Sequence, residues 1–169
     1  MTLPQSFKST QFLFYRPAHF LLLLVLLSSC AASRKARIRD EQVNSVLKTA
    51  RSYTGTPYLW GGNTKKGVDC SGLTCNAYQS VNLTLPRTAD AQALVGEKIK
   101  MKKLRPGDLV FFALGKKRRE ITHVGIVTEA KKDRVRFIHA TTQKGVMESD
   151  LSEEYYHKHF RLARRIIDK

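Results

Sequence analysis

The sequence predicts a domain of the α+β class, in which helices come first and an antiparallel sheet follows. Apolar residues recur at helical spacing in the first half, and the second half holds short apolar runs separated by turn residues and charged loops. This order of elements is typical of α+β domains. With 169 residues, the chain is long enough for one domain of ordinary size with its own core. No internal repeat and no second block of composition indicates another domain.

The first 29 residues are predicted to be a secretory signal peptide rather than part of the fold. Lys8 and Arg16 give a basic start, residues 20–27 read FLLLLVLL, and two serines precede Cys30. The apolar run is shorter than the roughly 20 residues that a membrane-spanning helix needs. The ending LSSC resembles the lipobox of bacterial lipoproteins, which implies cleavage just before Cys30 and lipidation of its thiol and amino group. A plain signal peptide that happens to contain a cysteine is the alternative.

A lipidated Cys30 would anchor the chain in the cell envelope, on a membrane facing the periplasm, because two or more acyl chains make a stable anchor. Ala31 follows this cysteine, where an Asp retains some lipoproteins at the inner membrane, so the outer membrane is favoured over the inner one. Residues 30–40 are then expected to form a short polar tether, and residues 41–169 the globular domain.

The chain is strongly basic, with 30 Lys and Arg against 14 Asp and Glu and a formal net charge of +16. Basic runs often bind nucleic acid. Here no aromatic residues are interleaved for base stacking, and an exported protein meets little nucleic acid, so we expect no nucleic-acid partner. Solvated loops and a basic segment next to the membrane are expected instead, with attraction to an anionic envelope surface as the alternative. The cysteine spacing does not fit a zinc site, and no metal or cofactor is predicted.

The first half of the domain is predicted to hold three helices. Five apolar side chains recur at helical spacing between residues 43 and 53, so an amphipathic helix of about three turns is expected from Glu41. Glycines and a proline then interrupt regular structure, which places residues 58–62 (YLWGG) in a loop or short bend. A second helix is predicted for residues 70–81, and a short third helix through Leu94 with Thr88 as its N-cap.

The second half is predicted to hold the strands. The turn sequence RPGD leads into the apolar run LVFFAL, which is predicted to be a buried strand. Residues 121–128 (ITHVGIVT) and 135–140 (VRFIHA) are predicted to be two further strands, separated by a charged turn. Residues 151–160 are expected to form a short helix or turn, and residues 160–167 a last strand.

Cys70 and Cys75 lie five residues apart in the sequence GVDCSGLTC. On a helix this spacing turns the two thiols about 140° apart, so a disulfide between them is not expected. Cys75 lies beside an apolar helix face and is predicted to be a buried structural thiol. Cys70 stands at the predicted start of the second helix, where free backbone N–H groups and the helix dipole favour the thiolate. Cys70 is therefore the candidate nucleophile.

A cysteine nucleophile needs a base, and His123 and His139 lie within predicted strands. If the charged loop joins these strands as a hairpin, its flanking residues Thr128 and Arg134 pair, and the same register places the two histidines directly opposite each other. His123 would take the proton of Cys70 or hold it in an ion pair, and His139 would fix the tautomer of His123. A single bulge would change this register. A core position without chemistry is the alternative for each histidine.

Six motifs in the chain resemble, in sequence and in order, those of the NlpC-type cell-wall cysteine peptidases, which are relatives of papain. The motifs are YLWGG, VDCSGL, LPRTADAQ, RPGDLVFF, HVGIV and FIHA. The resemblance covers about residues 41–165. It implies a papain-like fold, with the nucleophile at a helix N-terminus that packs on a C-terminal antiparallel sheet, and it implies that Cys70, His123 and His139 are the catalytic residues.

The resemblance also implies roles for residues near the nucleophile. Tyr58 of YLWGG is implied to help bind the oxyanion or the substrate. Asp69 and Ser71 are implied to lie near the charged end of the substrate, whereas local roles, as a helix cap and as a bond within the first turn, are the alternative. Arg87 matches a motif too, and both substrate binding and a structural ion pair are open for it.

Because the family cleaves peptide stems of peptidoglycan, the resemblance implies a murein endopeptidase that works through a Cys70 thioester. The bond is either the one between D-Glu and the diamino acid or the D-Ala to diaminopimelate cross-link. A papain-like amidase or acyltransferase is an alternative enzyme, and a non-catalytic lipoprotein that binds cell wall is an alternative of another class. We find no sequence that resembles an SH3-like wall-binding domain.

Overall fold

The structure is a computed structural model that describes residues 17–115, 117, 119–132 and 134–167, with side chains from residue 33 onward. Residues 1–16 of the predicted signal peptide lie outside the described residues, and so does the side chain of Cys30. The chain divides into two compact units, Met1–Ala36 and Arg37–Lys169. In the described part, no helix is both long enough and apolar enough to cross a membrane.

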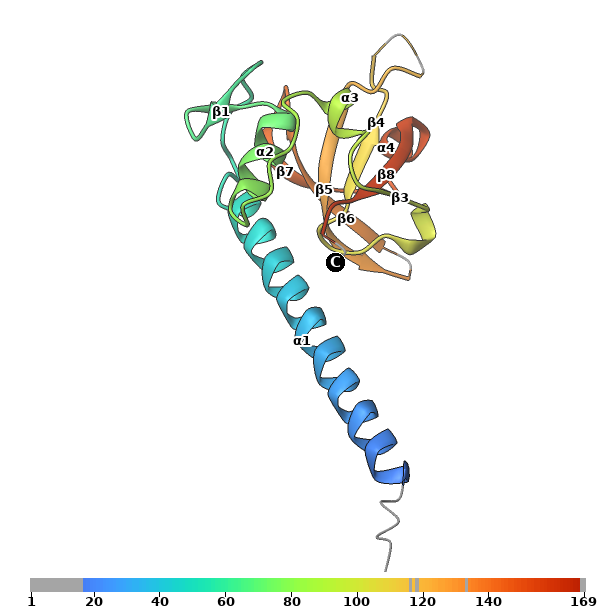
Figure 1. Cartoon of the computed structure of the whole chain (residues 1–169). Helices are drawn as coiled ribbons and strands as arrows, with labels where there is room; N and C mark the ends of the chain where they lie inside the picture. Colours follow the sequence, from blue (N-terminus) through green and yellow to red (C-terminus); the bar gives the residue numbers. More distant parts are fainter. Residues whose placement is uncertain (1–16, 116, 118, 133, 168–169) are drawn as a thin grey trace, which may run out of the picture. The chain divides into compact units, whose positions relative to one another are not determined.

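Helix α1 spans Pro17–Arg51 (Figure 1). Its C-terminal turns carry the predicted apolar positions, and Val46, Leu47 and Ala50 are buried there. The helix includes residues 30–40, which we expected to form a tether, and the described side chains from residue 33 to residue 40 are exposed or half-buried. No glycine or proline follows Pro17 within the helix, and Ala, Lys and Arg favour helical backbone, so no local signal ends it earlier.

Helix α2 (Cys70–Gln79) begins at the candidate nucleophile, as the sequence predicts. Asp69 is its N-cap, and Asp69 Oδ1 accepts a hydrogen bond from the backbone N–H of Gly72 at 2.6 Å. The short helix α3 (Ala89–Gln92) follows Thr88, also as predicted. Both helices therefore start directly after the predicted cap residues, but only Asp69 makes a side-chain cap hydrogen bond, and Thr88 makes none.

Six strands form one antiparallel sheet in the order β3-β8-β4-β5-β6-β7. The four strands β4 (Leu109–Phe112), β5 (His123–Lys131), β6 (Arg134–Thr141) and β8 (Phe160–Arg165) were predicted. The edge strands β3 (Glu97–Ile99) and β7 (Gly145–Asp150) were not. An edge strand is paired on one side only and carries polar residues, so its hydrophobic pattern is weak.

Smaller elements complete the fold. Strands β1 (Asn63–Thr64) and β2 (Gly67–Val68) form a separate two-stranded sheet. A 3-10 helix (Met101–Lys103) precedes β4, and helix α4 (Glu154–His159) precedes β8. The α4 helix confirms the short helix or turn that was expected for this part of the chain.

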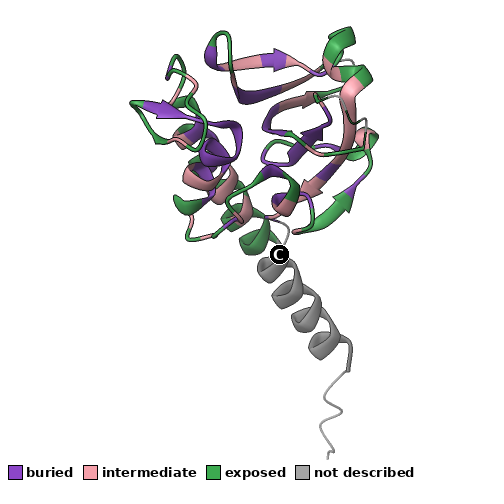
Figure 2. Ribbon diagram, turned by 90° about the horizontal axis from the view of Figure 1, so that it is seen from above, coloured by how far each residue is buried: buried purple, intermediate pink, exposed green. Residues whose placement is uncertain are grey.

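The core lies on both faces of the six-stranded sheet (Figure 2). Leu109 and Phe111 of β4 belong to the cluster that packs against α1 and α2, whereas Val110 and Phe112 belong to a second cluster. Tyr156 of α4 packs against this second cluster. Since neighbouring strand residues point to opposite faces, the two clusters cover the two sides of the sheet. The predicted α+β class, with N-terminal helices packed on a C-terminal sheet, is confirmed.

The register of the β5–β6 hairpin differs from the predicted one. Lys131 pairs with Arg134, so both strands extend closer to the turn than we expected. The register then shifts by one residue at a bulge that contains Thr128. The hydroxyl of Thr128 is buried and has no hydrogen-bond partner among the described residues.

Beyond the bulge, Ile126 pairs with Ile138, so the predicted direct pairing of His123 with His139 is wrong. Continuing this register sets His139 opposite Gly125, and His123 lies one diagonal step away on the same face. A Cβ atom built on Gly125 would lie 3.3 Å from the Cβ atom of His139 and 2.6 Å from the ring of Phe137. Glycine thus leaves room for the side chains on either side of it.

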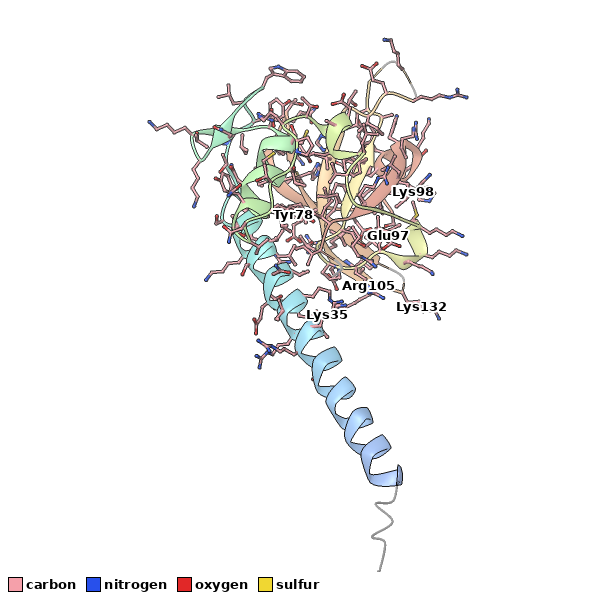
Figure 3. The ribbon with its side chains drawn as sticks, viewed as in Figure 1. Lys35, Tyr78, Glu97, Lys98, Arg105 and Lys132 are labelled. Carbon is pink, nitrogen blue, oxygen red and sulfur yellow. The ribbon has the colours of Figure 1, made fainter. Side chains whose placement is uncertain are left out.

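Several basic side chains lie at the surface of the domain. Lys98, Arg105 and Lys132 are exposed, and Figure 3 shows their side chains as sticks. Tyr78 of α2, labelled in the same figure, is by contrast fully buried and donates a hydrogen bond to the carbonyl oxygen of Gly107. Lys132 lies in the exposed turn between β5 and β6, where a solvated basic loop was expected, whereas Lys98 lies on the edge strand β3.

Candidate active site

Cys70 is the first residue of α2, and only 7% of it is exposed. Its thiol lies at the start of β5, where it interacts with the backbone N–H of Val124, as well as with the N–H groups of Ser71 and of Cys70 itself. Burial raises the pKa of the Cys70 thiol to about 11; the three N–H groups lower it, and the charge of Asp69 raises it. Burial therefore outweighs the helix start, which we expected to favour the thiolate, and the resting group is a neutral thiol.

His123 directly precedes Val124, whose backbone N–H interacts with the Cys70 thiol. Its Nε2 atom lies 2.8 Å from the Nδ1 atom of His139 on β6. The Nδ1 atom of His123 makes no hydrogen bond to any described residue. The structure thus brings His123 and His139 together and places Val124, the next residue after His123, at the Cys70 thiol.

Both imidazoles are held neutral by their surroundings. Burial lowers the pKa of His123 to about 4. Burial, and after it the neighbouring His123, lowers the pKa of His139 to about 3. Aromatic rings surround His139: the ring centroids of Phe137 and Tyr156 lie 4.6 Å and 5.2 Å from that of His139. No carboxylate among the described residues makes a hydrogen bond to either histidine, so their positive forms have no anionic partner.

The sequence analysis missed the residue that His139 contacts on its other side. His139 Nε2 lies 3.0 Å from the hydroxyl of Ser149 on β7 and 3.4 Å from the hydroxyl of Tyr156 on α4. The residues TTQKG, which follow the FIHA strand, are a turn signal that would have indicated one more hairpin strand next to His139. Pairing of that strand with β6 is what brings Ser149 to the site.

Asp69 makes hydrogen bonds through both of its oxygens. Oδ1 accepts from Ser71 at 3.1 Å and from Arg87 at 2.9 Å in addition to its cap bond, and Oδ2 accepts from Arg87 at 2.7 Å and from Gly61 N–H at 2.9 Å. Burial works against ionisation, but the hydrogen bonds from Arg87 and Gly72 outweigh it and hold the pKa of Asp69 below its usual value. Asp69 thus links the start of α2 to the YLWGG loop.

Arg87 completes this network from the LPRTADAQ segment. Besides Asp69, it donates to the Ser71 hydroxyl at 2.9 Å and to the carbonyl oxygen of Gly62 at 3.1 Å. The structural ion pair that we left open for Arg87 is therefore present, and Asp69, Ser71 and Arg87 are all bonded to one another. Their implied contacts with a substrate stay a prediction.

Gln92 supports the other side of α2. Its side chain is fully buried, donates to the carbonyl oxygens of Ser71 and Pro86, and accepts from the Thr74 hydroxyl at 2.7 Å. Cys75 is half-buried and bonded within the protein, since Gln92 Nε2 lies 3.4 Å from its sulfur. The described residues contain no group of three or more His, Cys, Asp or Glu side chains that could hold a metal ion.

A pocket of about 710 Å³ opens beside the histidine pair. Its lining includes Tyr58 of the YLWGG loop and both histidines. Residues that follow β6 in the sequence also line it, among them Lys144, Glu153 and Tyr155. Burial, followed by the charges of Cys70 and Asp69, raises the pKa of Tyr58, so this hydroxyl keeps its proton. The pocket is large enough for part of a peptide, and a hydrogen-bond donor stands at its edge.

The family model described as "NlpC/P60 family" matches residues 55–165. A protein named "Probable endopeptidase NlpC" from Escherichia coli (strain K12) is 39% identical over 153 residues, which are 86% of this chain and 96% of that protein. The "Murein DD-endopeptidase MepS/Murein LD-carboxypeptidase" of the same strain is 35% identical over 134 residues, which are 78% of this chain and 68% of that protein.

A solved structure supports the same relationship. It is described as similar to lipoprotein, NLP/P60 family, from Staphylococcus aureus subsp. aureus Mu50, and it superposes with a TM-score of 0.67 at 36% identity. The match covers 77% of this chain and 43% of that chain. Since the family model spans most of the domain, and both the sequence and the fold have close relatives in it, this chain belongs to the NlpC/P60 family of cysteine peptidases.

Proposed function

We propose that this protein is a peptidoglycan endopeptidase, which hydrolyses an amide bond in murein stem peptides or cross-links through a thioester on Cys70. One observation carries the proposal: a buried thiol at a helix N-terminus contacts the residue that follows His123 of a hydrogen-bonded histidine pair, in a chain closely similar to a named endopeptidase. Nucleophile, base and a residue that orients the base are the arrangement that covalent peptide hydrolysis requires.

In the first half-reaction, the Cys70 sulfur attacks the carbonyl carbon of the substrate while His123 Nδ1 takes the thiol proton. The backbone N–H of Cys70 and the Tyr58 hydroxyl donate to the developing oxyanion. His123 then gives the proton to the leaving nitrogen, the C–N bond breaks, and a thioester and a free amine result. In the second half-reaction, His123 takes a proton from water as the resulting hydroxide attacks the thioester. The C–S bond then breaks to give a carboxylic acid and the Cys70 thiolate, and His123 returns the proton to the sulfur.

The pKa directions indicate when the proton moves. Burial raises the pKa of the Cys70 thiol and lowers that of His123, so the resting pair is a neutral thiol and a neutral imidazole. The proton therefore moves to His123 as the sulfur attacks, rather than in a preformed ion pair. His123 acts as a general base in this scheme, and its low pKa makes it a good donor to the leaving amine.

Two bonds are candidates: the D-Ala to diaminopimelate cross-link and the bond between D-Glu and the diamino acid. The E. coli relative whose name includes DD-endopeptidase supports testing the cross-link first. Purified protein is incubated with cross-linked and monomeric muropeptides, and the products are identified by mass spectrometry. Cleavage of the cross-link yields two monomers, whereas cleavage after D-Glu shortens the stem.

The matched control is the second cysteine of the domain. We expect Cys70→Ser to abolish hydrolysis and Cys75→Ala to retain it, because Cys75 makes only structural contacts. Undiminished hydrolysis by the Cys70→Ser variant would contradict the nucleophile assignment. Release of intact stem peptides from the sugar would instead identify an amidase.

We also propose that the protein is a lipoprotein, lipidated at Cys30 and held on a membrane that faces the periplasm, with the outer membrane favoured. The apolar run FLLLLVLL, the ending LSSC and the Ala after the cysteine support this. Cells that express the protein are labelled with an alkyne analogue of palmitate and fractionated. Label is expected on the native chain and not on a Cys30→Ala variant, and equal labelling of both would contradict the proposal.

A further inference from the structure

The chain of hydrogen bonds that starts at His123 continues past His139 to a pair of hydroxyl groups. His139 Nε2 lies 3.0 Å from Ser149 Oγ and 3.4 Å from the Tyr156 hydroxyl. Ser149 is buried, with 5% of it exposed, and its hydroxyl approaches the same nitrogen of His139 as the Tyr156 hydroxyl does. Phe137 pairs with Ser149 and Met147 pairs with His139 in the β6–β7 ladder, so Ser149 reaches the imidazole as a diagonal neighbour on the same face.

The protons in this chain have two possible directions. For His123 to accept the Cys70 proton at Nδ1, its other nitrogen must carry the hydrogen and donate it to His139 Nδ1. His139 must then carry its own hydrogen on Nε2 and donate it to an oxygen. In the reverse direction, His139 Nε2 accepts from a hydroxyl, His139 Nδ1–H donates to His123 Nε2, and the hydrogen of His123 sits on Nδ1. An imidazole in that second state cannot take the thiol proton.

No fixed acceptor sets the direction by charge. The groups that hydrogen-bond His139, namely His123, Ser149 and Tyr156, can each donate or accept, and no carboxylate among the described residues bonds to this network. The outcome therefore depends on where the single proton of Ser149 goes. If it points to the oxygen of Tyr156, the lone pairs of Ser149 face His139 Nε2–H, and the productive direction results.

We propose that the Ser149–Tyr156 hydroxyl pair is the device that sets this direction: Tyr156 accepts the Ser149 proton, Ser149 accepts from His139, and His123 is thereby held with Nδ1 open toward Cys70. Ser149 and Tyr156 are positioning residues in this scheme, since they act on the proton transfer through His139. The inference rests on the proposed function only for its kinetic test, because the tautomers are measured without a substrate.

The direct test is the tautomeric state of the two histidines. Side-chain ¹⁵N spectra at neutral pH are recorded on the full chain in a Cys70→Ala background. We expect both His123 and His139 to carry the hydrogen on Nε2. In Tyr156→Phe the Ser149 proton loses its acceptor and turns to His139 Nε2, so His139 is expected to shift to the Nδ1–H form. In Ser149→Ala no donor of that kind remains, and the Tyr156 hydroxyl can still accept, so His139 is expected to stay in the Nε2–H form.

The kinetic test uses the same variants with Cys70 present. We expect Tyr156→Phe to lower kcat about tenfold or more, as is usual for loss of a group that orients a catalytic histidine, with KM changed less than about twofold. Ser149→Ala is expected to lower kcat less. The double variant Ser149→Ala/Tyr156→Phe is expected to be more active than Tyr156→Phe alone, because it lacks the Ser149 hydroxyl that would reverse the direction of the hydrogen bonds. Tyr53→Phe is the matched control, since its hydroxyl contacts Asn76 away from this network.

The outcomes separate the two proposals. An Nδ1–H tautomer of His139 in the protein with native Ser149 and Tyr156 would overturn the inference. A double variant that is less active than both single variants would also overturn it, because this result indicates that the two residues have purely structural roles. The tautomer measurement on the protein with native Ser149 and Tyr156 still tests the inference if Tyr156→Phe is too unstable to study. If the native chain does not cleave muropeptides but its histidines have the expected tautomers, the proposed function fails and the inference stands.

Discussion

His123 Nε2 lies 2.8 Å from His139 Nδ1, although the two residues are diagonal neighbours and not opposite partners in the β5–β6 ladder. The imidazoles meet edge to face, with an interplanar angle of 80°. Gly125 lies between His123 and Val127 on the same strand face and carries no side chain that would separate the rings. The contact between the two imidazoles therefore depends on Gly125, because a side chain at this position would stand between them.

His139→Asn is expected to be more active than His139→Ala. In the proposed hydrogen-bond direction, His139 Nδ1 accepts from His123, and an Asn carbonyl oxygen can accept in its place, whereas Ala leaves His123 free to rotate. We expect His139→Ala to lower kcat on the order of a hundredfold, the usual size of a general acid–base contribution. Muropeptide hydrolysis measures this, with exposed His157→Ala as the control. Equal rates for the two His139 variants would rule out the orienting role.

Gly125→Ala is expected to destabilise the fold and lower activity together. The new Cβ atom would lie 2.6 Å from the Phe137 ring and 3.0 Å from the Ile138 carbonyl oxygen, so the β5–β6 pair must shift. Overpacking of this kind costs about 1–3 kcal/mol of the free energy of unfolding. Chemical denaturation measures it. Gly115→Ala is the control, because its Cβ would meet only Thr122 at 3.5 Å and should leave stability unchanged.

The buried histidines make the fold less stable in acid. Their pKa values in the folded state, about 4 and about 3, lie below the unfolded value of about 6.5, so the unfolded chain binds protons first as the pH falls. Stability is thus full above about pH 6.5 and is lost as the pH falls toward the folded values, by up to about 1.4 kcal/mol per pH unit for each histidine.

Urea denaturation between pH 7.5 and pH 5 measures this loss. A His139→Asn variant is expected to lose less free energy of unfolding over the same interval, while His157→Asn, whose imidazole is exposed, is expected to behave like the native chain. An identical pH dependence in the native chain and in His139→Asn would contradict the neutral, buried state of His139.

Alkylation of Cys70 is expected to accelerate as the pH rises. Since burial raises the pKa of this thiol to about 11, the reactive thiolate is a minor species at pH 7 and grows about tenfold per pH unit until near pH 10. Iodoacetamide labelling in a Cys75→Ala background, followed by mass spectrometry, gives the rate. A rate that is already constant between pH 6 and pH 8 would indicate a preformed thiolate–imidazolium pair instead.

Arg87→Lys is expected to lower activity more than stability. Lysine cannot reproduce the fork that holds Asp69, Ser71 and the Gly62 carbonyl oxygen at once, so the YLWGG loop and the start of α2 lose their common anchor. Because the Arg87 side chain is 42% exposed, we expect a stability loss of only about 1 kcal/mol. Thermal unfolding and muropeptide hydrolysis are compared with Arg51→Lys, whose ion pair with Glu148 shares no residue with the Arg87 network. Full activity of Arg87→Lys would show that the fork is dispensable.

The parts of the site that depend on local chemistry were predictable from the sequence. Asp69 caps α2, Cys70 begins the helix, and the two histidines lie on neighbouring strands. These features were predictable because helix caps, helix starts and apolar runs depend on residues that are neighbours in the sequence. The thiolate expected at Cys70 was not borne out, since burial by distant elements decides the charge state and leaves no local sequence signal.

Pairing between strands was the part that the sequence did not determine. The loop that we assumed for the β5–β6 hairpin was too long, and a bulge at one threonine has no residue pattern that marks it. Ser149 was missed for the same reason, since its role appears only when β7 is placed beside β6. Such details follow from the balance of packing over the whole sheet.

The bulge at Thr128 has a consequence for how this hairpin tolerates changes in length. Without the extra residue, the pairing set at the turn would put His139 opposite Ile126, and the two histidines would point to opposite sides of the sheet. A one-residue insertion or deletion on either strand between the histidines and the turn, unless another bulge absorbs it, would therefore place the two imidazoles on opposite sides of the sheet. A two-residue change would keep both imidazoles on one side but would change the diagonal step between them.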